Sequence, residues 1–198
     1  MSARGRALGG TEGNEILTCV AAAVLTVLLL AEGVTIVRMR GLVTVHMFVG
    51  MVLIPPLVLK LASTGYRLTR YYAGAPAYRE KGPPLLALRL LAPLLVVSTL
   101  AVFVTGVDLL LLDHRSDVVL EVHKVSFIVW GVVFAVHFLA YVPRTARSLW
   151  RDWGAARRRA VPATGLRAML VAASVGAGVA LALSLLSAMT GWNNGHFH

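Results

Sequence analysis

Two histidines stand inside an almost wholly apolar stretch, LEVHKVSFIVWGVVFAVHFLAYVPR, which runs from residue 120 to 144. His123 and His137 are fourteen positions apart, and at about 100° per residue a helix returns them to within roughly 40° of one face. At about 1.5 Å per residue they differ in height by about 21 Å. An ionisable residue inside an apolar helix marks a functional site by default, so this spacing predicts two imidazoles on one face at two depths.

A second apolar stretch, LVTVHMFVGMVLIPPLVLK (residues 42–60), repeats the same interval. Lys60 follows His46 by fourteen residues, although the intervening Pro55 and Pro56 should bend the helix between them. His46 and His123 each lie about five residues from the start of their helices, roughly 7 Å below one interface. The pattern therefore predicts an outer pair, His46 with His123, and an inner pair, Lys60 with His137.

These residues belong to a chain whose composition is that of a membrane protein. Of the 198 residues, 58% are hydrophobic, and the mean hydropathy is +0.76. About 20 apolar helical residues cross a bilayer core of roughly 30 Å, where the backbone must satisfy its own hydrogen bonds. We therefore predict an all-α fold, one integral domain over residues 1–198 in the form of a five-helix transmembrane bundle. The predicted helices cover residues 14–37, 42–62, 86–112, 119–142 and 167–190.

The net charge of +10 follows the predicted topology. The N-terminus and the connections 64–84 and 144–165, together with the adjoining helix ends, hold 15 of the 19 lysines and arginines. The positive-inside rule then places the N-terminus in the cytoplasm and the C-terminus outside, in a multi-pass protein of the cell membrane. The basic charge is explained by topology and by contact with anionic lipid, so no nucleic-acid partner is expected.

The connections and the last helix suggest further contacts. Short turns at residues 38–41 and 113–117 make antiparallel neighbours of the helices that they join. The two longer basic connections are either amphipathic segments on the membrane surface or ordinary aromatic and basic belts. Ala172, Gly176 and Ala180 stand four residues apart on one face of helix 167–190. Such small residues let membrane helices approach closely, so this helix could also support an oligomer.

The histidine pattern resembles that of membrane-embedded b-type cytochromes, namely respiratory cytochrome b and the ferric-reductase-like family. In those families two helices each carry two histidines about fourteen residues apart, and the four rings ligate two stacked haems. The resemblance covers roughly residues 42–143. It implies haem b between His46 and His123, and His137 as one ligand of a second haem. Lys60 stands where the family has its fourth histidine, and a neutral lysine amine can ligate iron.

The stretch HMFVGMVLIPP, with HK and PR around the fourth helix, also resembles small actinobacterial membrane proteins, a likeness that implies no particular reaction.

Three further residues fit a haem site on physical grounds. Gly50 lies four residues after His46, on the same face, and would leave room for a macrocycle. Arg38 and Arg40, just outside the second helix, could pair with haem propionates. The alternatives are that Gly50 is a helix-packing glycine and that the two arginines only fix the turn at the interface.

Three functions remain open from the sequence. A b-type cytochrome would carry electrons to or from a partner, either an extracytoplasmic oxidoreductase or a quinone. A haem-free membrane scaffold or accessory subunit would use His46 and His123 only as hydrogen-bonding partners of acids such as Glu32 and Asp108. A proton or metal conduit through the same four residues would need polar residues continuing inward, and few are present.

Overall fold

The computed structural model describes the backbone of residues 9–80, 86–111, 116–152 and 161–196, and the side chains of 9–80, 89–111, 116–140 and 161–192. Within these ranges the chain is helical and has no strand. The helices are α1 (Gly10–Val37), α2 (Met39–Tyr72), α3 (Pro76–Arg79), α4 (Leu86–Leu111), α5 (Asp117–Asp152), α7 (Thr164–Ser184) and α8 (Leu186–His196). Five of these helices are long and apolar enough to cross a membrane: α1, α2, α4, α5 and α7. The prediction of an all-helical five-helix bundle is confirmed.

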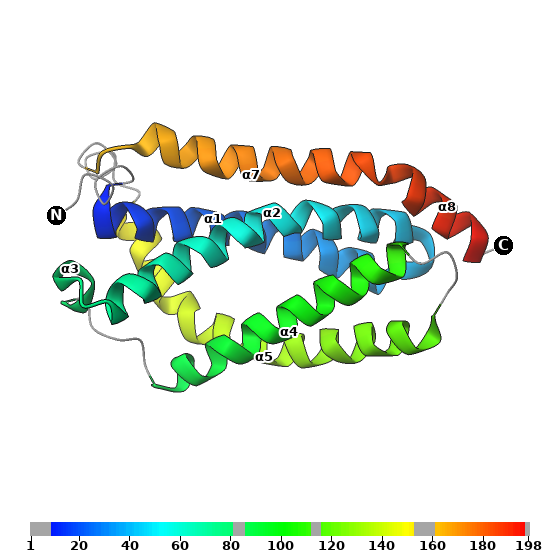
Figure 1. Ribbon diagram of the computed structural model, residues 1–198, viewed down its shortest axis with the longest axis horizontal. Helices are drawn as coiled ribbons and strands as arrows, with labels where there is room; N and C mark the ends of the chain where they lie inside the picture. Colours follow the sequence, from blue (N-terminus) through cyan, green and yellow to red (C-terminus); the bar gives the residue numbers. More distant parts are fainter. Residues whose placement is uncertain (1–8, 81–85, 112–115, 153–160, 197–198) are drawn as a thin grey trace.

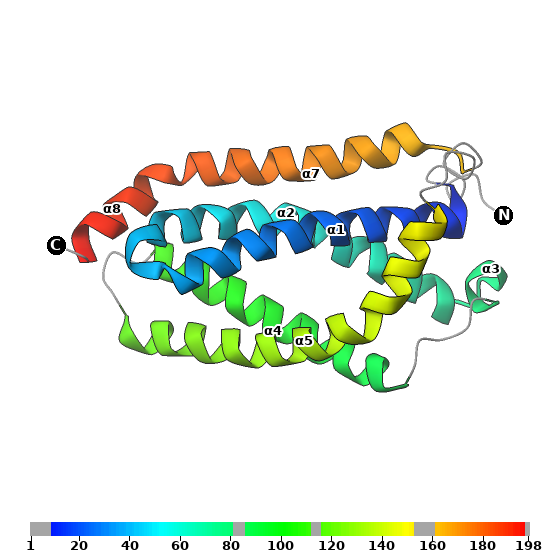
Figure 2. The ribbon, with the colours of Figure 1, turned by 180° about the vertical axis from the view of Figure 1, so that it is seen from behind.

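The long helices form two hairpins and a covering helix. α1 packs along α2, α4 packs along α5, and α7 lies along α2 on the side away from the second hairpin (Figure 1). The same arrangement seen from behind shows the later part of α5 turning away from α4 (Figure 2). The turn between α1 and α2 lies at the same end of the bundle as the last turn of α4 and the first turn of α5. α1 begins at one end of the bundle and α8 ends at the other.

Two helices extend well beyond the apolar segments that predicted them. α2 continues to Tyr72 instead of ending near residue 62, and α5 continues to Asp152 instead of residue 142. Hydropathy shows where a segment leaves hydrocarbon, whereas backbone hydrogen bonding continues until a helix-stopping residue intervenes. Gly74, with a φ of +83°, follows the end of α2. The predicted turn at 113–117 falls largely outside the described residues.

The bend expected at Pro55 and Pro56 agrees with the course of α2, which changes direction near the middle of its length (Figure 1). The residue inside α2 with non-helical backbone angles is Leu42, close to the start of the helix. The two prolines therefore lie within continuous helical geometry, and His46 and Lys60 lie on opposite sides of the bend.

The last predicted helix differs from expectation in two respects. The segment 167–190 is divided at Leu185, where the backbone leaves helical geometry between α7 and α8. The face that carries Ala172, Gly176 and Ala180 is exposed, so it is not the face on which α7 packs. α7 instead meets α2 through Gly178, whose Cα lies against the backbone of Val52.

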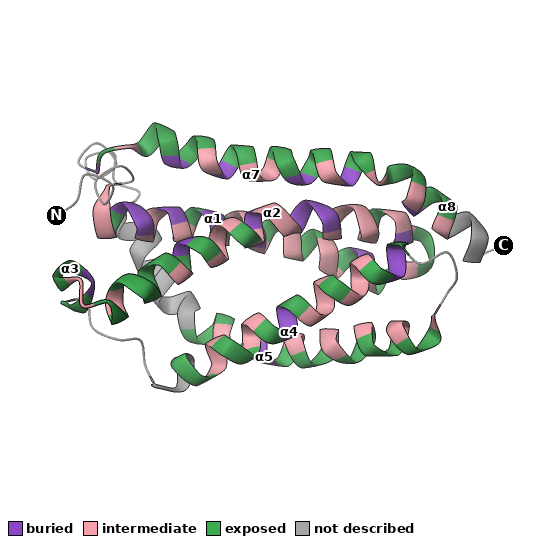
Figure 3. Ribbon diagram, in the orientation of Figure 1, coloured by how far each residue is buried: buried purple, intermediate pink, exposed green. Residues whose placement is uncertain are grey.

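Burial is concentrated where α7 covers the first hairpin (Figure 3). The central cluster joins Met51 and Val52 of α2 to Leu110 of α4, Ala182 of α7 and Met189 of α8. By contrast, only 6% of the apolar window of α5 is buried within the chain, against 17–28% for the other four spanning helices. α5 therefore offers most of its surface to lipid or to another partner.

A polar cluster joins α1 to α2 near the N-terminal end of α1. Ser63 Oγ lies 2.9 Å from Asn14 Oδ1 and 2.6 Å from Thr18 Oγ1, and Asn14 Nδ2 donates to the Ser63 carbonyl over 3.1 Å. Asn14 and Ser63 are buried. Because buried polar groups in an apolar setting need partners, this cluster fixes the register of the first hairpin.

We predict that Ser63→Ala lowers the free energy of unfolding by about 1–3 kcal/mol, because Asn14 Oδ1 and Thr18 Oγ1 each lose a buried hydrogen-bonding partner. Thermal unfolding in detergent measures the loss. Ser184→Ala is the matched control, since the exposed Ser184 hydroxyl bonds only to the Leu181 carbonyl of its own helix. Equal effects of the two changes would contradict the role of the cluster.

Candidate functional site

His46 is held by the helix that precedes it. Its Nδ1 lies 2.9 Å from Glu32 Oε1 and 3.1 Å from Thr35 Oγ1. Glu32 and Thr35 are three residues apart in α1, so both side chains reach the same face. The side chains of His46 and Glu32 are only 20% and 12% exposed. The imidazole and the carboxylate therefore form a partly enclosed pair within the first hairpin.

His123 is held in a similar way within the second hairpin. Its Nδ1 lies 3.0 Å from Thr105 Oγ1 of α4. The next residue of α4, Gly106, leaves space for the ring, because a Cβ at this position would lie 3.1 Å from His123 Cε1. The imidazole thus lies against the backbone of α4. A side chain larger than that of Gly106 would leave less space for the ring.

The hydrogen bonds of the threonine hydroxyls favour one tautomer of each ring. Thr105 Oγ1 donates to the Ala101 carbonyl over 2.6 Å, and Thr35 Oγ1 donates to the Glu32 carbonyl over 2.7 Å. A hydroxyl whose proton is used in this way accepts from the histidine Nδ1–H. In the neutral Nδ1–H tautomer, which this arrangement favours, each ring presents the lone pair of Nε2. Among the side chains described, none hydrogen-bonds to Nε2 of either ring.

The two anchored rings lie near each other. His46 and His123 are close enough to interact electrostatically, and they come from α2 and α5. With Glu32 and Thr35 from α1 and Thr105 and Gly106 from α4, they make up the histidine cluster. The prediction placed these two rings at one depth by counting residues, and the structure shows an electrostatic interaction between them.

The two residues of the predicted inner pair also interact electrostatically. Lys60 of α2 interacts electrostatically with His137 of α5, and also with Cys19 of α1. Both Lys60 and His137 are partly buried. A lysine amine and an imidazole therefore share the opposite half of the bundle, about fourteen residues along each helix from the histidine cluster.

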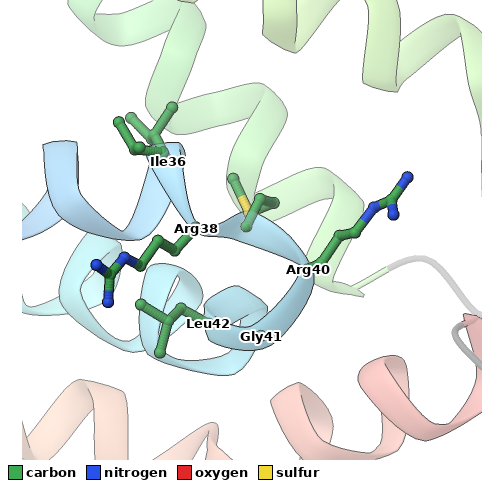
Figure 4. Close-up of a pocket in the computed structure, with 7 residues that line it drawn as sticks. Ile36, Arg38, Arg40, Gly41 and Leu42 are labelled. Atoms are coloured by element: carbon green, nitrogen blue, oxygen red, sulfur yellow. The ribbon is translucent and has the colours of Figure 1, made fainter.

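The remaining predicted residues lie beside the histidine cluster rather than between its rings. A Cβ on Gly50 would lie 3.7 Å from Glu32 Oε1, so this glycine borders the carboxylate that holds His46. Arg38 and Arg40 are exposed in the turn between α1 and α2, where residues 36–42 line a shallow pocket of about 570 Å³. The two guanidinium groups point away from each other (Figure 4), so they are not aimed at one common anion.

The sequence signals some members of the histidine cluster and not others. Glu32 stands out as an acid in an apolar helix, and Thr35 follows it by one turn. Gly106 gives no signal, because its role depends on how α4 and α5 are placed side by side. Asp108, which the sequence places with the histidines, lines a different surface, between α2 and α4.

No group of three or more histidine, cysteine, aspartate or glutamate side chains that could hold a metal ion is found in the described part of the chain. A site at His46 and His123 would supply two protein ligands, which suits a metal already held in a macrocycle better than a bare ion.

Comparison of the chain with family models, with curated proteins and with solved structures finds no match. The fold and the site define a class in general terms: an all-helical protein of multi-pass membrane type, with one histidine hydrogen-bonded within each of two helical hairpins.

Proposed function

We propose that this chain is a transmembrane b-type cytochrome in which His46 and His123 would hold a haem b through Nε2 of each ring. Haem b supplies reversible one-electron chemistry when it is bound. The protein would hold the group between two helical hairpins, near one face of the cell membrane. It would carry electrons to or from a partner, either an extracytoplasmic oxidoreductase or a quinone.

The observation that carries this proposal is the shared anchoring of the two rings. Metal-ligating histidines usually donate their other ring N–H to a carboxylate, a carbonyl or water, which fixes the tautomer and the ring orientation. Glu32 and Thr35 hold His46 in this way, and Thr105 holds His123. Both rings would thus be oriented to ligate through Nε2, one from α2 and one from α5.

The surroundings of the rings also suit a large apolar cofactor. Gly106 keeps the backbone of α4 close to His123 without a side chain in between. The main helix contacts lie within each hairpin and between α2 and α7, rather than between the hairpins. Lys60 and His137 would hold a second haem deeper in the bundle, if the lysine amine is neutral there.

A haem-free scaffold or accessory subunit is the second candidate. The observation in its favour is that Nδ1 of both rings already has a protein partner, and Glu32 has Thr35 beside it. A structural role would need nothing more than these hydrogen bonds. In that case His46 and His123 would join helices without binding a cofactor.

The test is a reduced-minus-oxidised absorption spectrum of the detergent-purified chain from haem-replete cells, with haem quantified per chain. We expect a b-type spectrum with at least one haem in the wild type, and loss of the haem held by the outer pair in His46→Ala and in His123→Ala. His196→Ala, in the last residue of α8, is the control and should keep its spectrum. A wild-type stoichiometry near two that falls to one in His137→Ala would assign the inner pair.

A colourless, folded wild-type protein from such cells would overturn the proposal and favour the haem-free scaffold. Full haem content in both His46→Ala and His123→Ala would refute the assignment of these ligands.

A further inference from the structure

A groove of about 570 Å³ runs along the outside of the bundle between α2 and α4. Its walls are aliphatic and aromatic, with Ile54 and Val58 on α2 and with Leu100 and Val104 on α4. Asp108 of α4 is the one ionisable residue among those that line it. No residue of the histidine cluster lines this groove, so it is a separate surface and does not depend on the proposed haem.

The charged residue lies at one end of the apolar surface. Leu100 and Asp108 are eight residues apart in α4, or about 12 Å along the helix axis. Asp108 is exposed and stands three residues before Leu111, the last residue of α4. The carboxylate is therefore near the membrane interface, and the apolar walls extend from it toward the middle of the bilayer.

The carboxylate is available to an outside partner. No hydrogen bond or ion pair to Asp108 is found among the residues that the structure describes, whereas Glu121, another exposed acid at this end, pairs with Lys124 over 2.8 Å. An acid at membrane depth usually meets a cation or a hydrogen-bond donor. Within the described part of the chain no cation faces Asp108, so a cationic group of a molecule bound in the groove could meet this carboxylate.

We propose that this groove binds a phospholipid with a primary ammonium headgroup, phosphatidylethanolamine, from the leaflet at this end of the bundle. The ammonium would donate charge-assisted hydrogen bonds to Asp108, and an acyl chain would lie along the apolar walls. A quaternary ammonium headgroup has no N–H to donate, and an anionic headgroup would be repelled by the carboxylate. The groove therefore selects one headgroup by charge and by hydrogen bonding together.

Native mass spectrometry of the full chain tests this selectivity, after equilibration with equal amounts of phosphatidylethanolamine, phosphatidylcholine and phosphatidylglycerol that carry the same acyl chains. We expect the wild type to retain phosphatidylethanolamine preferentially, by roughly tenfold, the size of one charge-assisted hydrogen bond. Asp108→Asn should lose this preference, and the control Glu121→Gln, a matched change outside the groove, should keep it. Val104→Trp, which fills the groove, should lower retention of the preferred lipid while the helical circular dichroism spectrum is unchanged.

Three results would overturn the proposal: an unchanged preference in Asp108→Asn, a preference of the wild type for the anionic or the choline lipid, or retention that Val104→Trp leaves intact.

Discussion

Replacing Gly178 with valine is expected to lower the free energy of unfolding by about 3 kcal/mol, and more if the helices cannot separate. A Cβ at this position would overlap the Val52 carbonyl oxygen of α2 and lie 3.0 Å and 3.1 Å from Val52 Cα and carbonyl carbon. These are backbone atoms inside a helix, so they cannot move aside as a flexible side chain would. α7 must therefore move away from α2, which also opens the central cluster at Ala182.

Thermal unfolding in detergent measures this loss, which corresponds to roughly 6–12 °C in midpoint for a chain of this size. Gly176→Val is the matched control on the same helix. Gly176 is exposed, and nothing lies within 4 Å of a Cβ built there. Both variants replace a helical glycine by valine, so their difference isolates the contact with α2. Similar losses in the two variants would show that α7 does not pack through Gly178.

The contrast between Gly178 and Gly176 shows what the sequence of a membrane helix can and cannot predict. Length and hydropathy identify α7 as a spanning helix, because only an apolar helix satisfies its backbone in hydrocarbon. They do not identify the packed face, because the lipid-facing and protein-facing sides are equally apolar. The regular spacing of Ala172, Gly176 and Ala180 favoured one face, and the helix packs through another.

In the histidine cluster, too, the sequence indicates some residues and not others. His46 and His123 could be paired from the sequence, because each lies at a countable depth in a helix of known direction. Glu32 could be suspected, since an acid in an apolar helix needs a partner. Thr105 and Gly106 could not be found, because the sequence does not distinguish Thr105 from Ser98 and Thr99 of the same helix as a partner of His123. Only the side-by-side placement of α4 and α5 selects the residue that meets His123.

Within the haem-binding proposal, we expect Glu32→Gln to weaken haem retention by about 10–100-fold, the usual range for loss of an outer-shell partner of a metal ligand. Glutamine fills the same space, but its neutral amide accepts a weaker hydrogen bond from His46 Nδ1 than the carboxylate does over 2.9 Å. The imidazole becomes a poorer electron donor, so the reduction potential of the haem should also rise. Haem transfer to an excess of an acceptor protein measures retention, and a spectroscopic redox titration measures the potential.

Glu121→Gln is the control for this change, because Glu121 is exposed at the same end of the bundle and pairs with Lys124. Unchanged retention and potential in Glu32→Gln would mean that the carboxylate does not orient an iron ligand.

The Glu32→Gln variant also distinguishes the two candidate functions, by a different route from the histidine variants. A scaffold requires Glu32 only as a hydrogen-bonding partner, and an amide that still accepts from His46 would cost it about 1 kcal/mol of stability. A cytochrome requires the negative charge itself, because that charge makes the imidazole a stronger ligand.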